Sequence, residues 1–259
     1  MSKPGVTRAE LNWYFGDSQI SKHRICVVVP AHNEAGTIGE IIAQLFALDL
    51  DLAVFIVDDA STDETAAIVS QSAAHLLSLS SWLGAWGATQ AGIRRAHYLG
   101  FDYVVTMDAD GQHPVEAIPE LINAVINEEI NLVIGSHTAR GSLLRQLAWK
   151  AIRWVSRVEV EDITSGFRAY DRTAIQIASS ERASYLDYQD LGVLILALEG
   201  GIRIGEVPVK MRQREQGSSR IFKTWFAVAI YMLTTLLLGL VKSRGVRLSD
   251  KAAVQGGPT

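Results

Sequence analysis

The chain has 259 residues, of which 48% are hydrophobic and 20% charged, so it can bury a sizeable core and is neither disordered nor fibrous. Its formal net charge of −4 argues against a general nucleic-acid binder. A single cysteine excludes an intramolecular disulfide and fits a reducing compartment. We expect no secretory signal, because residues 1–24 contain no apolar h-region.

Strands and helices are expected to alternate over residues 25–135. Most of the strands are continuous apolar, β-branched runs, and in chain order they lie at 25–29, 53–57, 75–79, 103–107 and 132–135. The i, i+3, i+4, i+7 spacing of Ile38, Ile41, Ile42 and Leu45 predicts a helix after the first strand, and further helices are expected over 88–99 and 115–128. This alternation predicts a Rossmann-like α/β fold with a mainly parallel sheet flanked by helices, in which ligands bind at the carboxyl ends of the strands.

Two helix starts carry a possible capping box. Thr37 and Glu40 have the T-x-x-E spacing, and Ser61 and Glu64 have the S-x-x-E spacing. Each pair is therefore expected to cap the helix that follows it.

The loop after the fourth strand crowds acidic and amide side chains together. Asp108, Asp110 and Gln112 lie within five residues, and carboxylates this close repel each other unless a cation lies between them. Mg²⁺ or Mn²⁺ prefers such oxygen ligands and usually adds substrate phosphates to one or two protein carboxylates, which suits a nucleotide diphosphate. The alternative is an Asp-rich turn that only ends a strand.

Acidic residues also follow the first two strands. Asp58 and Asp59 end the second strand, where a carboxylate can accept a hydrogen bond from a base N–H or a ribose hydroxyl; helix capping is the alternative. Glu34, close to Pro30, could contact the ribose or base, whereas His32 is more often simply a loop histidine.

Two later segments offer phosphate-binding donors. Gly166 allows close backbone approach, and Arg168 presents a planar fork of N–H donors, unless it is a surface arginine paired with Asp171. Residues 212–220 form a second basic segment that contains Arg214 and Gly217, and the alternative here is a solvated charge run.

These loops, in this order, resemble the family 2 glycosyltransferases, which have the GT-A fold. The resemblance extends over roughly residues 24–223 and is closest to the branch that moves a sugar from a nucleotide onto a polyprenyl (dolichol-type) phosphate. It implies that Pro30, Glu34 and Asp58 or Asp59 hold the nucleoside. It further implies the following roles: a divalent metal and diphosphate on Asp108, Asp110 and Gln112; the acceptor phosphate on Ser165, Arg168, Ser219 and Arg220; and donor phosphate contacts from Arg214.

The chain departs from this family pattern at two places. Residues 83–87 lack the lysine that is common near the donor phosphate, and Gly192 stands where a carboxylate is common. Asp190, two residues before Gly192, is the remaining candidate for the base. Asp110 and Arg168 are the other two candidate catalytic residues. A phosphate monoester, with a second pKa of about 6, is already ionised near neutrality and attacks without a base, so this departure favours a lipid-phosphate acceptor and one inverting displacement.

The C-terminal part of the chain has a different character. Residues 1–200 carry 14 basic and 25 acidic side chains, whereas residues 201–259 carry 10 basic and 3 acidic ones around an uncharged run at 224–241. The run would span roughly 27 Å as a helix, at the lower limit for crossing a bilayer. A spanning helix, an interfacial helix, a helix that pairs with another subunit and a buried core helix all remain open.

The predicted organisation is an extension at 1–23, a GT-A domain at 24–223, a membrane-associated or transmembrane helix at 224–243 and a flexible tail at 244–259. The predicted activity is that of an inverting, Mg²⁺- or Mn²⁺-dependent glycosyltransferase on the cytoplasmic face of a membrane, peripheral or single-pass. It would use a UDP- or GDP-linked sugar and polyprenyl phosphate, with a homo-oligomer left open. The alternatives are a saccharide acceptor, or an inactive nucleotide-binding membrane partner.

Overall fold

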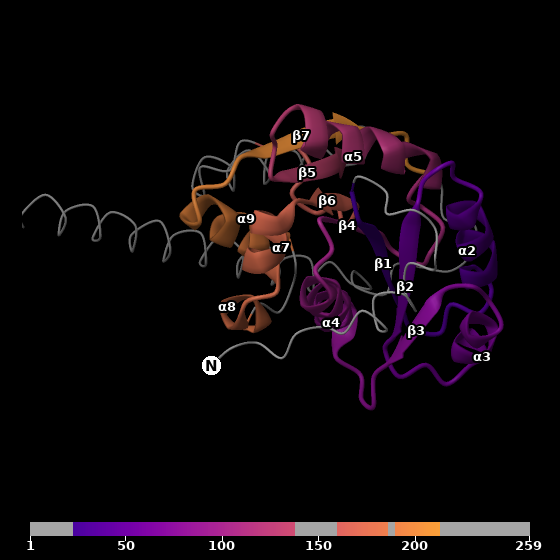
Figure 1. Cartoon of the computed structure of the whole chain (residues 1–259). Helices are drawn as coiled ribbons and strands as arrows, with labels where there is room; N and C mark the ends of the chain where they lie inside the picture. Colours follow the sequence, from indigo (N-terminus) through magenta and orange to yellow (C-terminus); the bar gives the residue numbers. More distant parts are fainter. Residues whose placement is uncertain (1–22, 138–159, 186–189, 213–259) are drawn as a thin grey trace, which may run out of the picture.

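A computed structural model describes residues 23–137, 160–185 and 190–212. Within these residues, seven strands form one sheet in the order β3-β2-β1-β4-β6-β5-β7 (Figure 1). The strands span the following residues: β1 Ile25–Ala31, β2 Leu52–Asp58, β3 His75–Ser78, β4 Tyr103–Thr106, β5 Leu132–Ser136, β6 Arg168–Tyr170 and β7 Ile204–Pro208. The five strands predicted over residues 25–135 are therefore confirmed, each to within two residues.

The sheet is mainly parallel, as predicted, with one exception. β1 pairs in parallel with both β2 and β4. The pairs β2–β3 and β5–β7 are also parallel. β6 is antiparallel to both of its neighbours, β4 and β5. The strand–helix alternation over residues 25–135 gave no indication of this insertion, because β6 lies beyond it and is only three residues long.

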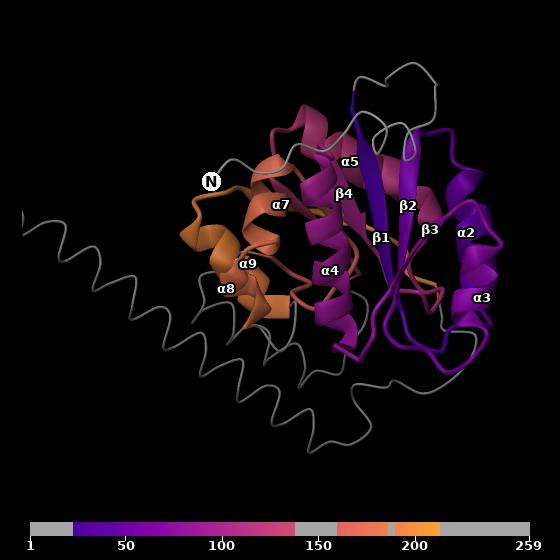
Figure 2. The same cartoon turned by 60° about the horizontal axis from the view of Figure 1, so that its bottom comes forward.

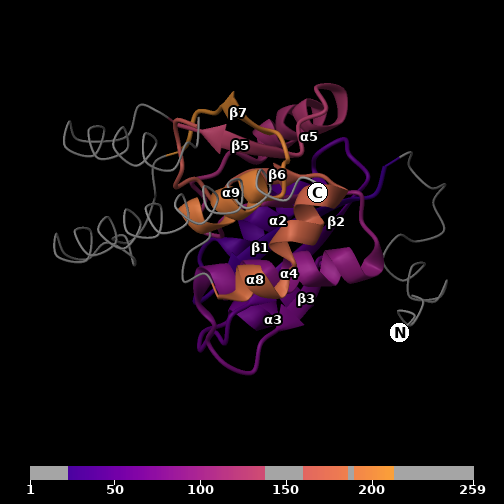
Figure 3. The ribbon, with the colours of Figure 1, turned by 90° about the vertical axis from the view of Figure 1, so that its left-hand side faces the viewer.

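Helices cover both faces of the sheet, because side chains alternate along each buried strand. Cys26, Val28 and Phe55 face the layer that contains α4, α7 and α9, whereas Val27, Val29 and Ile56 face the layer that contains α2 and α5. The helices are α2 Ile38–Phe46, α3 Thr65–Ser70, α4 Gly84–Leu99, α5 Ile118–Asn127, α7 Arg172–Ala178, α8 Glu181–Ser184 and α9 Asp190–Glu199. Figure 3 shows α8 and α9 on the same side of the sheet as α4.

The two predicted capping boxes are wrong. Thr37 is the N-cap of α2, but it makes no side-chain cap; its Oγ1 donates instead to the carbonyl of Ala109, at 2.6 Å. Ser61 lies before the start of α3, and its Oγ accepts the backbone N–H of Asn33 at 2.9 Å. Both hydroxyls therefore join separate loops rather than satisfy helix ends.

None of the helices among the described residues is long and apolar enough to cross a membrane. The uncharged run at 224–241, the predicted membrane helix at 224–243 and the tail at 244–259 lie outside those residues.

The first prediction concerns close packing between α4 and the sheet. A Cβ on Gly92 would lie 2.3 Å from Val28 Cγ1 and 3.0 Å from Val57 Cγ2, and both valines are fully buried and β-branched. We expect Gly92→Ala to lower the free energy of unfolding by about 1–3 kcal/mol, measured by urea denaturation. Gly39→Ala is the matched helical control, because its Cβ meets only Ile68 at 3.6 Å, and it should be neutral or slightly stabilising.

The second prediction concerns an ion pair at the amino end of β4. Burial would raise the pKa of Asp102, but hydrogen bonds from the Arg24 N–H and the Arg172 guanidinium outweigh it and lower that pKa. A carboxyl with a lowered folded-state pKa stabilises the fold above its unfolded pKa of about 3.9, and this contribution is lost as pH falls through the folded value. Asp102→Asn should therefore lower the melting midpoint at pH 7, and its difference from the parent chain should narrow as the pH falls below the unfolded pKa. A difference that stays constant as the pH is lowered would contradict this.

Candidate active site

Three loops meet at the carboxyl edge of the sheet because β1 is hydrogen-bonded to both β2 and β4 in parallel register. Ala31 is the partner of Asp58, and Val28 is the partner of Thr106. In Figure 2, β1 and β2 run side by side towards the lower edge, where the loops that follow them gather. The acidic residues predicted after β1, β2 and β4 are thus neighbours in space.

The loops after β1 and β2 are joined by hydrogen bonds around Asn33. This residue has a left-handed φ of 55°, which is uncommon outside glycine, and its Oδ1 accepts the N–H of Thr62 at 2.7 Å. The N–H of Glu34 donates to Thr65 Oγ1 at 2.8 Å, and Ala60 also has a φ of 55°. Backbone strain at two adjoining loops is a feature of functional sites, where the surrounding structure must hold it in place.

The predicted nucleoside-binding residues lie together in this region. Pro30 and Glu34 are half-buried, and Asp58 and Asp59 are buried. Asp58 Oδ1 accepts the Ser61 N–H at 3.2 Å, and Asp59 Oδ1 accepts the Leu83 N–H at 2.7 Å. These bonds give both carboxylates a structural role, and nucleoside binding by these four residues stays a prediction.

The loop after β4 presents oxygen atoms to solvent. The side chain of Asp108 is 44% exposed, and Asp110 accepts hydrogen bonds from the backbone and side-chain amide of Gln112. Gly111 has a φ of +76°, a conformation that an L side chain rarely adopts, so glycine allows the turn. Among the described residues no group of three or more His, Cys, Asp or Glu side chains is arranged to hold a metal. Two carboxylates are nevertheless sufficient for Mg²⁺ or Mn²⁺ when substrate phosphates complete the coordination, so the residues present fit the ion.

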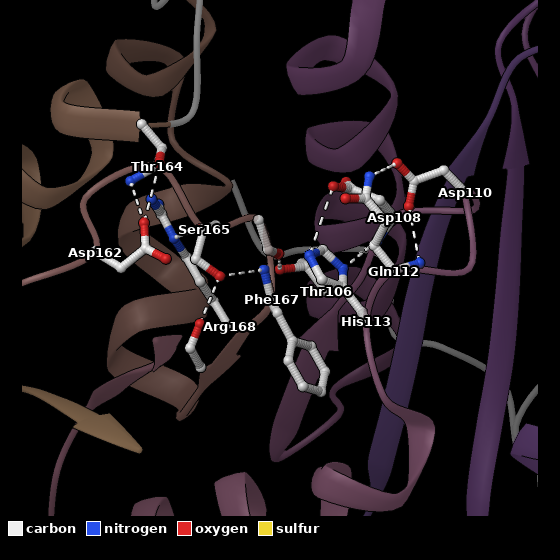
Figure 4. Close-up of polar contacts among 12 residues, drawn as sticks. Thr106, Asp108, Asp110, Gln112, His113, Asp162, Thr164, Ser165, Phe167 and Arg168 are labelled. Atoms are coloured by element: carbon white, nitrogen blue, oxygen red, sulfur yellow. Dashed lines mark hydrogen bonds and ion pairs between the residues drawn. The ribbon is translucent and has the colours of Figure 1, made fainter. Parts of the chain in front are cut away.

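Other elements hold this loop at three points. Thr37 Oγ1 donates to the Ala109 carbonyl, and the backbone N–H of Arg212 donates to the Gln112 carbonyl at 2.8 Å. At the third point, the Asp108 N–H donates to His113 Nδ1 at 2.9 Å (Figure 4). The carboxylates are therefore carried on a well-restrained turn. Sequence reasoning assigned Thr37 to a helix cap and missed this contact, because the loop that it reaches is 72 residues away.

Arg168 and Ser165 are both buried, and their contact with an acceptor phosphate stays a prediction. Arg168 is 0% exposed, and its Nε and Nη2 donate to the carbonyls of Ser165 and Ile163 at 2.8 and 2.9 Å. The Ser165 hydroxyl is also buried; it donates to the Gly135 carbonyl at 2.6 Å and accepts the Phe167 N–H at 3.2 Å. Arg168 begins the antiparallel strand β6, and these hydrogen bonds hold the 163–168 turn in place.

The 162–168 segment nevertheless adjoins the acidic loop. Thr106 pairs with Arg168 in the sheet, and Thr106 Oγ1 donates to the Gly166 carbonyl at 2.7 Å. The ring of His113 stacks on that of Phe167, with centroids 5.1 Å apart (Figure 4). The structure thus brings the two predicted phosphate-handling segments together at one edge.

Glu206 is a further residue that sequence reasoning did not identify as part of this region. Its carboxylate accepts the N–H groups of Glu161 and Asp162 at 2.7 and 2.9 Å, which anchors the start of the 162–168 segment to β7. Its position in the middle of β7 gave no indication of this role, because the residues that it anchors lie 44 and 45 positions earlier in the chain.

Four predicted site residues cannot be placed. Arg214, Ser219 and Arg220 lie outside the described residues, as does the side chain of Asp190 at the start of α9. Arg212, which begins the predicted basic segment, contacts the acidic loop through Gln112, and its guanidinium pairs with Glu116 at 2.9 Å.

Comparison with known proteins gives a consistent family. The model described as glycosyl transferase family 2 matches residues 26–178, which is more than half of the chain. A polyprenol monophosphomannose synthase of Mycolicibacterium smegmatis is 28% identical over 217 residues, covering 76% of this chain and 81% of that protein. An undecaprenyl-phosphate mannosyltransferase of Micrococcus luteus is 32% identical over 218 residues, covering 76% and 87%.

A solved structure supports the fold. Glucosyl-3-phosphoglycerate synthase from Mycobacterium tuberculosis, in complex with Mn²⁺, UDP-glucose and phosphoglyceric acid, has a TM-score of 0.65 at 23% identity, over 92% of this chain and 85% of that one. The sheet flanked by helices is therefore of the GT-A type expected from the sequence. On the family match and these relatives, the chain belongs to glycosyl transferase family 2.

Proposed function

We propose that the protein transfers a sugar from a nucleotide-diphospho-sugar to polyprenyl phosphate, with inversion and with Mg²⁺ or Mn²⁺ as cofactor. The observation that carries the proposal is the solvent-facing Asp108–Gln112 turn, set between the nucleoside-type loops after β1 and β2 and the segments at 162–168 and 209–212. The names of the relatives from M. smegmatis and Micrococcus luteus, a polyprenol and an undecaprenyl-phosphate enzyme, support the acceptor class.

In the donor half of the site, one group of residues would bind the nucleoside and another would bind the metal. Pro30, Glu34 and Asp58 or Asp59 would bind the nucleoside at the ends of β1 and β2. Asp108 and Asp110, with Gln112 beside them, would hold the metal. The bound ion would neutralise charge on the leaving diphosphate.

The acceptor half depends on cations rather than on a general base. A phosphate monoester is already ionised near neutrality, so it needs positioning and charge compensation but no proton removal. Because Ser165 and Arg168 are buried and hydrogen-bonded to backbone carbonyls, we assign direct contact with the acceptor phosphate to Arg214, Ser219 and Arg220. Arg214 follows two residues after Arg212 in the chain, and the backbone N–H of Arg212 donates to the Gln112 carbonyl of the acidic loop.

A lipid-linked acceptor places the enzyme at a membrane surface. We infer peripheral or single-pass association on the cytoplasmic face, where nucleotide sugars are made and where the basic 201–259 region would meet anionic lipid headgroups.

The proposal predicts metal-dependent turnover that requires Asp110. Purified full-length protein is incubated with a panel of UDP- and GDP-sugars, polyprenyl phosphate and Mn²⁺ or Mg²⁺, and glycolipid is measured by thin-layer chromatography. We expect a chelator to abolish product, added metal to restore it, and Asp110→Ala to reduce turnover by on the order of 100-fold or more.

The matched control for that assay is Asp51→Ala, which removes an exposed carboxylate before β2, away from the carboxyl edge. It should keep full activity. Turnover only with saccharide acceptors would show that the acceptor is a saccharide and not polyprenyl phosphate. Nucleotide binding without turnover under any condition would indicate an inactive member of the family.

A further prediction distinguishes the roles of Arg168 and Arg214. Arg168→Ala should lower the free energy of unfolding by roughly 2–4 kcal/mol, because it leaves buried carbonyls without donors. Arg214→Ala should leave stability within about 0.5 kcal/mol and raise the KM for polyprenyl phosphate at least tenfold. If Arg168→Ala instead keeps the parent free energy of unfolding but raises the KM for polyprenyl phosphate, Arg168 itself binds the acceptor phosphate.

A further inference from the structure

The environment of His113 sets it apart from a solvent-exposed loop histidine. Its side chain is 7% exposed, whereas that of Asp108, the residue to which it is hydrogen-bonded, is 44% exposed. The ring packs nearly parallel to Phe167, at an interplanar angle of 12°. The histidine therefore contacts the acidic turn from the buried side of that turn.

The hydrogen bond defines which ring nitrogen carries the proton. Nδ1 accepts the Asp108 N–H, so in the neutral ring the proton is on Nε2. Nε2 lies 3.7 Å from Asp108 Oδ2, too far for a direct hydrogen bond but close enough for a favourable electrostatic contact. One imidazole thus contacts both the backbone and the carboxylate of the same residue.

We propose that His113 is a positioning residue, which fixes the direction of the Asp108 carboxylate through its bond to the Asp108 N–H and locks the turn against the 162–168 segment by stacking on Phe167. The inference rests on the proposed function, since it assigns this carboxylate to a divalent cation. Groups that orient metal-binding carboxylates in this way change metal affinity by about 10- to 100-fold when they are replaced. His113 itself contacts neither the cation nor the sugar in this account.

Two substitutions separate the two contacts. His113→Asn keeps an acceptor, because Asn Oδ1 is the same number of bonds from the backbone as Nδ1, but it loses the aromatic ring. His113→Phe keeps a ring to stack on Phe167 but has no acceptor for the Asp108 N–H. His75→Phe is the matched control, because His75 is half-buried in β3 and its ring meets Phe55, away from the acidic turn.

The experiment measures two quantities on each full-length variant. NMR hydrogen exchange of the Asp108 amide reports the hydrogen bond directly, and EPR titration of Mn²⁺ in the presence of UDP, then of GDP, reports metal affinity. We expect His113→Phe to lose protection of the Asp108 amide and to bind Mn²⁺ about tenfold more weakly at an unchanged melting midpoint. His113→Asn should keep most of the affinity, and His75→Phe should match the parent chain.

The remaining outcomes decide against the proposal in distinguishable ways. An Asp108 amide that stays protected in His113→Phe, or unchanged Mn²⁺ affinity, would overturn it. Equal loss of affinity in both His113 variants, together with a lower melting midpoint, would assign His113 to ordinary packing and also overturn it. If the parent chain binds no Mn²⁺ with either nucleotide, the proposed function fails, while the exchange data still decide whether His113 restrains Asp108.

Discussion

The parallel pairing of β1 with both β2 and β4 is the constraint on which the site depends. Because the three strands run in the same direction in register, their carboxyl ends coincide, and the polar loops that follow them have no alternative but to meet. Apolar burial on both faces of these strands holds that register. Local hydrogen bonds then refine the positions of the loops, as Asn33 does between the first two and Thr37 does between the first and the third.

The buried Arg168 stabilises the segment beside the acidic loop on the same sheet. A fully buried guanidinium is costly unless its donors are satisfied, and here backbone carbonyls of the preceding turn accept them. The result is a rigid 163–168 turn beside β4, anchored further by Glu206 and by the Ser165 hydroxyl. The turn that contains Gly166 is thereby held next to the acidic loop.

Much of the sheet was predictable because short, continuous, β-branched apolar runs that alternate with helices are typical of strands buried on both faces of an α/β sheet. The acidic residues after β1, β2 and β4 were predictable for the same reason, since their place in the chain order fixes the edge at which they lie. The roles of Thr37, Ser61, Ser165 and Arg168 were not. Their residue types suit a cap or a phosphate site equally well. Thr37, Ser61 and Ser165 have hydrogen-bond partners on segments that are distant in the chain, whereas the partners of Arg168 lie in the turn just before it.

The central claim is that Asp108 and Asp110 hold a divalent cation that carries a nucleotide diphosphate. The most direct measurement is a crystal structure of the protein with Mn²⁺ and UDP, with the ion located by its anomalous scattering. The account predicts one ion within about 2.2 Å of oxygens from both carboxylates, bridged to the diphosphate, with the nucleoside over the ends of β1 and β2. An ion or nucleotide bound elsewhere, with these two carboxylates pointing to solvent, would contradict it.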